Sequence, residues 1–213
     1  MVSSMKRYVP YALFIGGLLV LCTLMPRFNT AQPRGAHLTR AQAMAIADAA
    51  ARQINVPVDR AWSNIIWDSS DPLIKEFEND PQRRKRAAAD PTLGPRLGYY
   101  DIAYFRRGSE KSTPYGRVKV SANTGEVLGA RHPMTMEERG ASATEQTLRP
   151  RADAFVHSRI FPGAPWPKFE QARPTVQRNR TDWVFRYRVA TAVPAGNVVP
   201  YLNVYFNGDQ FGG

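Results

Sequence analysis

The sequence predicts an α+β fold, in which an N-terminal transmembrane helix precedes two repeated units, each a helix packed on an antiparallel β-meander. Three observations predict it. Residues 8–25 form an uncharged apolar stretch, and the order of one helix followed by alternating strands occurs twice. The stretch "RVKVSANTGEVLG" (117–129) is matched by "YLNVYFNGDQFGG" (201–213), and each is predicted to be an alternating strand, an Asn-Gly type turn and the opening of a returning strand.

The apolar stretch predicts an uncleaved signal-anchor within residues 1–34. It approaches the roughly 20 residues that a helix needs to cross a bilayer, and no A-x-A cleavage pattern follows it. Lys6 and Arg7 favour an N-terminus inside the cell, although Arg27 and Arg34 on the far flank reduce the charge difference. We expect a single-pass protein of the bacterial inner membrane that contacts lipid through residues 8–25 and has its remaining residues outside the cytoplasm.

The net charge of +11 raises the question of an anionic partner. The one dense basic run, "RRKR" at 83–86, lies in a polar stretch without interleaved aromatic residues. This pattern favours a solvated face or contact with a membrane surface, and we expect no nucleic-acid partner. The only cysteine, Cys22, excludes an intramolecular disulfide and a cysteine-based zinc site.

The first unit is expected at 37–135. Thr39 and Gln42 form a capping-box signature that starts an Ala-rich helix, which residues 55–57 end. Four strands follow, at 60–68, 99–105, 116–122 and 126–132, with a turn at Asn123-Thr124-Gly125 before the last. The strand at 99–105 alternates as a half-buried strand does, and the polar insertion before it contains a short helix at 71–80.

The second unit is expected at 141–213. Its helix, within 144–161, carries the apolar stripe Leu148, Ala152, Phe155 and Val156, and Pro150 is tolerable only if the helix begins near Thr147. Strands are predicted at 166–176, 182–190 and 200–206. Only "DQFGG" follows the turn at Asn207-Gly208, so we expect one side of the last strand to be unpaired, the unit to be incomplete, and the natural chain to continue.

These residues carry two resemblances. The helix-plus-meander unit that ends in V-x-V-x-x-x-T-G-x-V resembles the PepSY class of extracytoplasmic domain. The following stretches resemble the N-terminal region of some CPBP-family (CAAX protease and bacteriocin-processing) intramembrane metalloproteases. They are the anchor, "LTRAQAMAIADAAA", "YYDIAYFRRGSEKSTPYGRVKVSANTGEVLGARH", "MEERGASATEQTLRPRADAFV", and "NRTDWVFRYR" with the "FNGDQ" turn. That resemblance spans residues 8–211.

The CPBP resemblance implies catalytic helices with a Glu-Glu-x-x-x-Arg motif and separated histidine motifs, and this chain contains neither. "EERG" at 137–140 has the paired glutamates, but a glycine follows, Ser142 stands where the arginine belongs, and no apolar span surrounds it. We therefore expect residues 137–140 to be a linker between the repeats.

No other catalytic, cofactor-binding or metal-binding residue is predicted, and no cofactor. His37, His132 and His157 have no metal-ligand spacing, and no nucleophile elbow, P-loop or dinucleotide fingerprint occurs. Asn179-Arg180-Thr181 matches a glycosylation acceptor, but a tight turn explains it equally well, and the alternating stripe at Trp183 is typical of a core.

Two functions remain open. In the first, the chain is a binding or regulatory module whose sheet edges and aromatic residues contact a peptide, an envelope component or its own downstream protease domain. In the second, it is part of an intramembrane metalloprotease whose chemistry lies on residues outside this chain.

Overall fold

The computed structural model describes residues 11, 14–20, 37–68, 75–77, 80–107, 114–158, 166–191, 193 and 199–213. The chain divides into two compact units, Met1–Arg34 and Gly35–Gly213. The account below concerns the second unit, which contains all the strands described.

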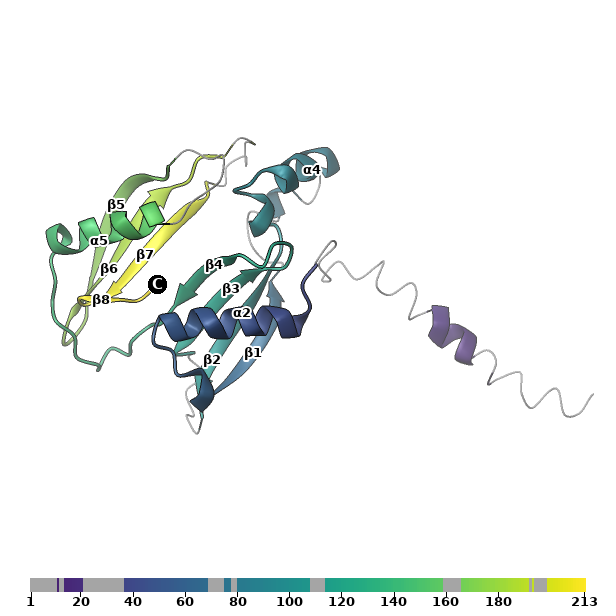
Figure 1. Cartoon of the computed structure of the whole chain (residues 1–213), viewed down its shortest axis with the longest axis horizontal. Coiled ribbons are helices and arrows are strands. Elements are labelled where there is room, and N and C mark those ends of the chain that lie inside the picture. The colour runs from purple at the N-terminus through teal and green to yellow at the C-terminus, as the bar shows by residue number, and fades with distance from the viewer. Residues whose placement is uncertain are drawn as a thin grey trace, which may run out of the picture. The chain divides into compact units, whose positions relative to one another are not determined.

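Two four-stranded antiparallel sheets, each preceded by one helix, make up this unit (Figure 1). In the first, helix α2 (Arg40–Gln53) precedes β1 (Ala61–Asp68), β2 (Tyr99–Arg106), β3 (Gly116–Ser121) and β4 (Val127–Arg131). In the second, α5 (Glu145–Ser158) precedes β5 (Lys168–Val176), β6 (Thr181–Arg188), β7 (Tyr201–Asn207) and β8 (Gln210–Phe211). Strands neighbour one another in chain order in both sheets, which confirms the predicted α+β class.

Local signals in the sequence start and end these elements. Thr39 caps α2 in a complete capping box with Gln42, and Asn55 ends it in the left-handed region at φ 61°. Gly125 (φ 75°) and Gly208 (φ 64°) occupy the two predicted turns in the left-handed conformation that glycine adopts without strain. A side chain at Gly208 would also meet the Ala141 carbonyl.

Each helix covers one face of its own sheet and forms a separate core with it. In the first repeat, alanines of α2 pack against strands β2 and β3; the core residues include Ala43, Ala47, Ala50, Ala51, Tyr100, Ile102, Tyr104, Val118 and Val120. In the second, the core residues are Leu148, Ala152, Val156, Phe185, Tyr187, Val204 and Phe206. Phe211 packs against both cores.

The two helices match residue by residue. The same interval along the chain separates Thr39 from Thr144 and Asp48 from Asp153. Thr39 and Thr144 both accept a hydrogen bond from a backbone N–H three residues later. Each aspartate accepts a hydrogen bond from a buried tyrosine, Tyr104 to Asp48 at 2.8 Å and Tyr187 to Asp153 at 2.7 Å. Burial, and then the bond to the carboxylate, raises the pKa of both phenols.

The predicted membrane anchor and inner-membrane location require correction. In the part of the chain that the structure describes, no helix combines the length and the apolar character needed to cross a bilayer. Within the predicted stretch, the structure describes residues 11 and 14–20. The remainder of 8–25 lies outside the described residues.

Two further expectations also differ from the structure. α5 begins at Glu145 and contains Pro150, because Thr144 and not a later residue provides its N-terminal cap. β2 is buried on both faces: on the face away from α2, the Lys119 ammonium packs over the Tyr99 ring at 4.6 Å, and Arg117 pairs with Asp101 at 3.1 Å.

The end of the chain differs as well. The segment after Gly208 turns back as β8 and pairs with β7, with Phe206 opposite Phe211. The pairing extends to Tyr205, which donates to the Gly213 carbonyl and accepts from the Gly212 N–H at 2.8 Å. The prediction of an unpaired side is therefore wrong for this end of β7.

The insertion between β1 and β2 contains a helix that the sequence analysis did not predict. α4 (Pro81–Ala89) includes the basic run 83–86, and it begins with Asp80 as N-cap and Pro81 in its first turn. Of the predicted helix at 71–80, the structure describes residues 75–77 as helical, and most of the rest lies outside the described residues.

Candidate functional site

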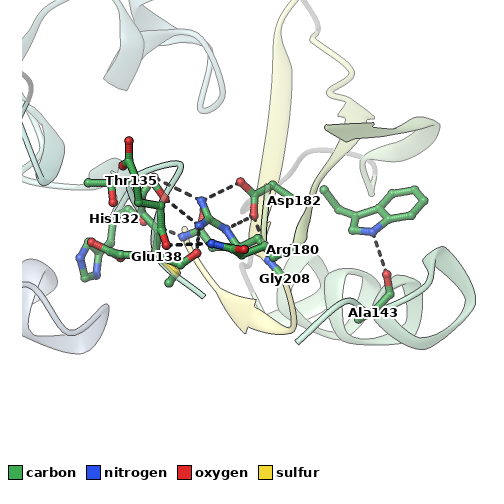
Figure 2. A network of polar contacts seen from close by, with 12 residues as sticks. His132, Thr135, Glu138, Ala143, Arg180, Asp182 and Gly208 are labelled. Atoms are coloured by element: carbon green, nitrogen blue, oxygen red, sulfur yellow. Dashed lines mark hydrogen bonds and ion pairs between the residues drawn. The ribbon is translucent and has the colours of Figure 1, made fainter. Parts of the chain in front are cut away.

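The linker between the two repeats is held by one buried arginine. Arg180, whose side chain is 1% exposed, forms a bidentate ion pair with Asp182, with Nε to Oδ1 at 2.7 Å and Nη2 to Oδ2 at 3.0 Å. Its Nη1 donates to the carbonyls of Thr135 and Glu138 at 2.7 and 2.6 Å (Figure 2). These guanidinium N–H groups of Arg180 all donate to groups of the protein itself, so the network has a structural role.

We call this network of Arg180, Asp182 and the carbonyls of Thr135 and Glu138 the clasp, and contacts of neighbouring residues add to it. Asn179 donates to the Glu137 carbonyl at 3.1 Å, and the Gly208 N–H donates to Asp182 at 3.0 Å. Asn207 donates to the His132 carbonyl at 2.7 Å, while the His132 N–H donates to the Gly212 carbonyl at 2.9 Å. Residues 137–140 thus form the predicted linker between the repeats, and their backbone is what the second repeat binds.

The other residues that the sequence singled out lie apart. His37 precedes α2, the His132 Nδ1–H donates to the Ile54 carbonyl at 3.0 Å, and His157 packs beside Trp166 at 4.8 Å between ring centroids. Asn179 lies in the turn between β5 and β6, and Trp183 packs against the second core. Among the described residues, no three His, Cys, Asp or Glu side chains gather as metal ligands would.

A pocket of about 760 Å³ lies where the first sheet meets the end of α2. Three arginines line it: Arg60 directly before β1, and Arg106 and Arg107 at the end of β2. The remaining lining residues are Asn55, Pro57, Asp59, Tyr115, His132 and Glu138. Asp59 is already paired with Arg52 at 3.3 Å, so the pocket presents an excess of positive charge.

Tyr115 forms one wall of this pocket. Its hydroxyl donates to the Pro57 carbonyl at 3.0 Å, and burial raises the pKa of the phenol. The Arg107 Nε donates to the carbonyl of Ala61, the first residue of β1, at 3.4 Å. The arginines therefore lie at the end of the first sheet where its edge strand begins.

That edge strand, β1, exposes large apolar side chains. Ala61, Ile65 and Trp67 point toward the core, and the alternate residues lie on the other face. There Trp62 is 50% exposed and stacks on Phe105 at 4.2 Å between ring centroids, and Ile66 is 47% exposed. Exposed side chains of this size at a sheet edge are typical of contact surfaces.

The corresponding strand of the second repeat, β5, is protected against pairing. It contains Pro174, which has no backbone N–H, and an irregularity in its register between Phe169 and Gln171. It also carries Lys168 and Arg173, and charged residues, prolines and bulges are the devices that keep sheet edges apart. β1 has no proline, lysine or arginine and pairs with β2 in unbroken register along its whole length.

Neither this difference nor the arginine pocket was predicted from the sequence. The signal for the first was present, since "AWSNIIWD" lacks every protective residue that "KFEQARPTV" contains. The pocket left no local signal in the sequence, because its arginines lie at the start of β1 and at the end of β2, and the insertion separates these two strands along the chain. Comparison with known proteins finds no matching family model, no matching curated protein and no matching solved structure.

Proposed function

We propose that this protein is a binding module that holds an extended segment of a partner protein by adding it to the edge of β1 as a further strand of the first sheet. The observation that carries the proposal is the contrast between two equivalent edges, of which β5 is protected and β1 is not. Strand addition uses the backbone groups of an edge for affinity and the alternate side chains for specificity.

The register indicates which backbone groups of β1 point outward. The Ala122 N–H donates to the Gly98 carbonyl at 3.0 Å, which continues the β2–β3 register and orients the even-numbered residues of β2 toward β3. Odd-numbered residues of β2 then face β1 and pair with its even-numbered residues. The N–H and C=O groups of Ser63, Ile65 and Trp67 therefore point away from the sheet, and no described strand pairs with them.

The exposed side chains lie where an added strand would use them. Trp62 and Ile66 stand on one face of β1, and side chains directly opposite one another in paired strands have Cβ atoms about 4.5–5.5 Å apart. Two apolar or β-branched side chains of the partner, at alternate positions, would cover them. Burial of apolar surface contributes about 25 cal/mol per Å², so this contact would stabilise the complex in addition to the backbone hydrogen bonds.

The test is a proline at the outward-facing Ser63. Octapeptides are first selected from a random library for binding to the full chain. Their affinity for the Ser63→Pro variant is expected to be at least tenfold lower, because the proline removes one outward N–H at an exposed position. Ser63→Ala is the matched control and is expected to bind as the wild type does. Hydrogen exchange is the second measurement: bound peptide should slow exchange of the amides of Ser63, Ile65 and Trp67.

Selected peptides that bind Ser63→Pro as tightly as wild type, and leave those amides unprotected, would refute strand addition. Circular dichroism of each variant verifies that the fold is retained. The resemblance to PepSY-like domains and to the N-terminal region of CPBP-family proteases stays a prediction; the repeated helix-and-meander topology is compatible with it.

A further inference from the structure

The edge of β1 and the arginine pocket adjoin one another. Arg60 immediately precedes Ala61, and Arg107 donates to the carbonyl of that residue at 3.4 Å. Arg106 is the register partner of Ala61 in β2. A strand added along β1 would therefore have one of its ends at the three arginines.

We propose that the partner's segment is a C-terminal tail that runs antiparallel to β1, with its terminal carboxylate bound in this pocket by Arg60, Arg106 and Arg107. The inference rests on the proposed strand addition and names the class and direction of the strand. The pocket, at about 760 Å³, has room for a carboxylate together with the last one or two side chains. Guanidinium groups bind carboxylates in a bidentate geometry that suits this task.

Charge determines the direction of the strand. An antiparallel strand places its C-terminus at the start of β1, beside the arginines, and its earlier residues near Asp68 at the other end. A parallel strand would place its N-terminal ammonium against the three guanidinium groups. Like charges brought together in this way destabilise a complex, so the antiparallel arrangement is favoured at this end of β1.

The acidic side chains of the pocket do not cancel its charge. Asp59 forms an ion pair with Arg52 at 3.3 Å, which leaves the single carboxylate of Glu138 against the three guanidinium groups of the pocket. The chain as a whole carries +11, so an acidic tail is attracted from a distance, while a second copy of this chain is repelled. The fitting partner is a different protein that ends in an extended, acidic C-terminal segment.

The experiment compares two random octapeptide libraries, one displayed with free C-termini and one tethered through its C-termini. Binders are expected from the first library, with Asp or Glu enriched at the final positions. Each selected peptide is then synthesised as the acid and as the C-terminal amide, and fluorescence anisotropy gives both dissociation constants. We expect the acid to bind at least tenfold more tightly than the amide.

Variants then assign this difference to the pocket. Arg106→Gln with Arg107→Gln is expected to reduce the affinity for the acid to that for the amide and to leave the affinity for the amide unchanged. The control is Arg173→Gln with Arg178→Gln, two exposed arginines of the second repeat that remove the same charge. The acid should bind this control variant with no more than a twofold change.

The outcomes separate this inference from the proposed function. Acid and amide forms that bind equally, while Ser63→Pro still abolishes binding, overturn the C-terminal tail and leave strand addition in place. An absence of binders from both libraries overturns both. A dimer of the chain in sedimentation that Ser63→Pro dissociates would show that β1 pairs with a second copy, and would also overturn both.

Discussion

Replacement of Arg180 by methionine should destabilise the protein by about 3–5 kcal/mol, because it removes one partner of a buried ion pair. The loss leaves Asp182 with the Gly208 N–H as its remaining donor at 3.0 Å, and leaves the carbonyls of Thr135 and Glu138 without their 2.7 and 2.6 Å bonds. For a chain of this size, each kcal/mol lowers the midpoint by about 2–4 °C, so we expect a fall of about 6–20 °C.

The assay is thermal and urea unfolding followed by circular dichroism, with Arg178→Met as the matched control. Arg178 lies in the same turn and is exposed, so its replacement changes the charge equally and should alter stability by less than about 0.5 kcal/mol. Adding Asp182→Asn to Arg180→Met should recover part of the loss, because the uncompensated carboxylate is then removed. A cost below about 1 kcal/mol for Arg180→Met would refute the clasp as a stabilising element.

Two further predictions concern stability. Burial and the bonds to Asp48 and Asp153 raise the pKa values of Tyr104 and Tyr187, so the unfolded state loses these protons near pH 10 while the folded state keeps them. The free energy of unfolding should therefore be unaffected below pH 10 and fall above it, by up to about 1.4 kcal/mol per pH unit for each tyrosine. In each Tyr→Phe variant, the urea midpoint should fall less steeply with pH in that range. Phe211→Ala should lower the free energy of unfolding in urea by about 2–3 kcal/mol, because the ring packs on both cores. Loss of hydrogen-exchange protection in only one of the two sheets would contradict this placement of the ring.

Much of the fold follows from local pattern. Alternation, the capping box at Thr39 and the glycine turns predict the helices α2 and α5, seven of the eight described strands and the opening of a returning strand at β8, since each of these signals acts within a few residues. The sequence marks the start of α4 with Asp80 and Pro81, an N-cap residue followed by a proline in the first turn.

The long-range contacts, on which the arginine pocket also depends, were much less predictable, for a physical reason. Arg180 is one of many arginines in the sequence, and its burial depends on carbonyls of a linker some forty residues away. The two-sided burial of β2 likewise depends on where Arg117 and Lys119 fold over it, which alternation cannot indicate. Long-range contacts of this kind leave no mark on the local pattern.

The matched helices share their register but not the volume of their side chains. Where α2 has Ala43 and Ala51, α5 has Leu148 and Val156, and α2 accordingly packs closely on β2, β3 and β4 while α5 lies closest to β6. A chimaera with α5 in place of α2 would force larger side chains into a space shaped for methyl groups, and the reciprocal exchange would open cavities. The two repeats therefore share an order of elements without sharing interchangeable parts, because the side chains of each helix fit the sheet on which it packs.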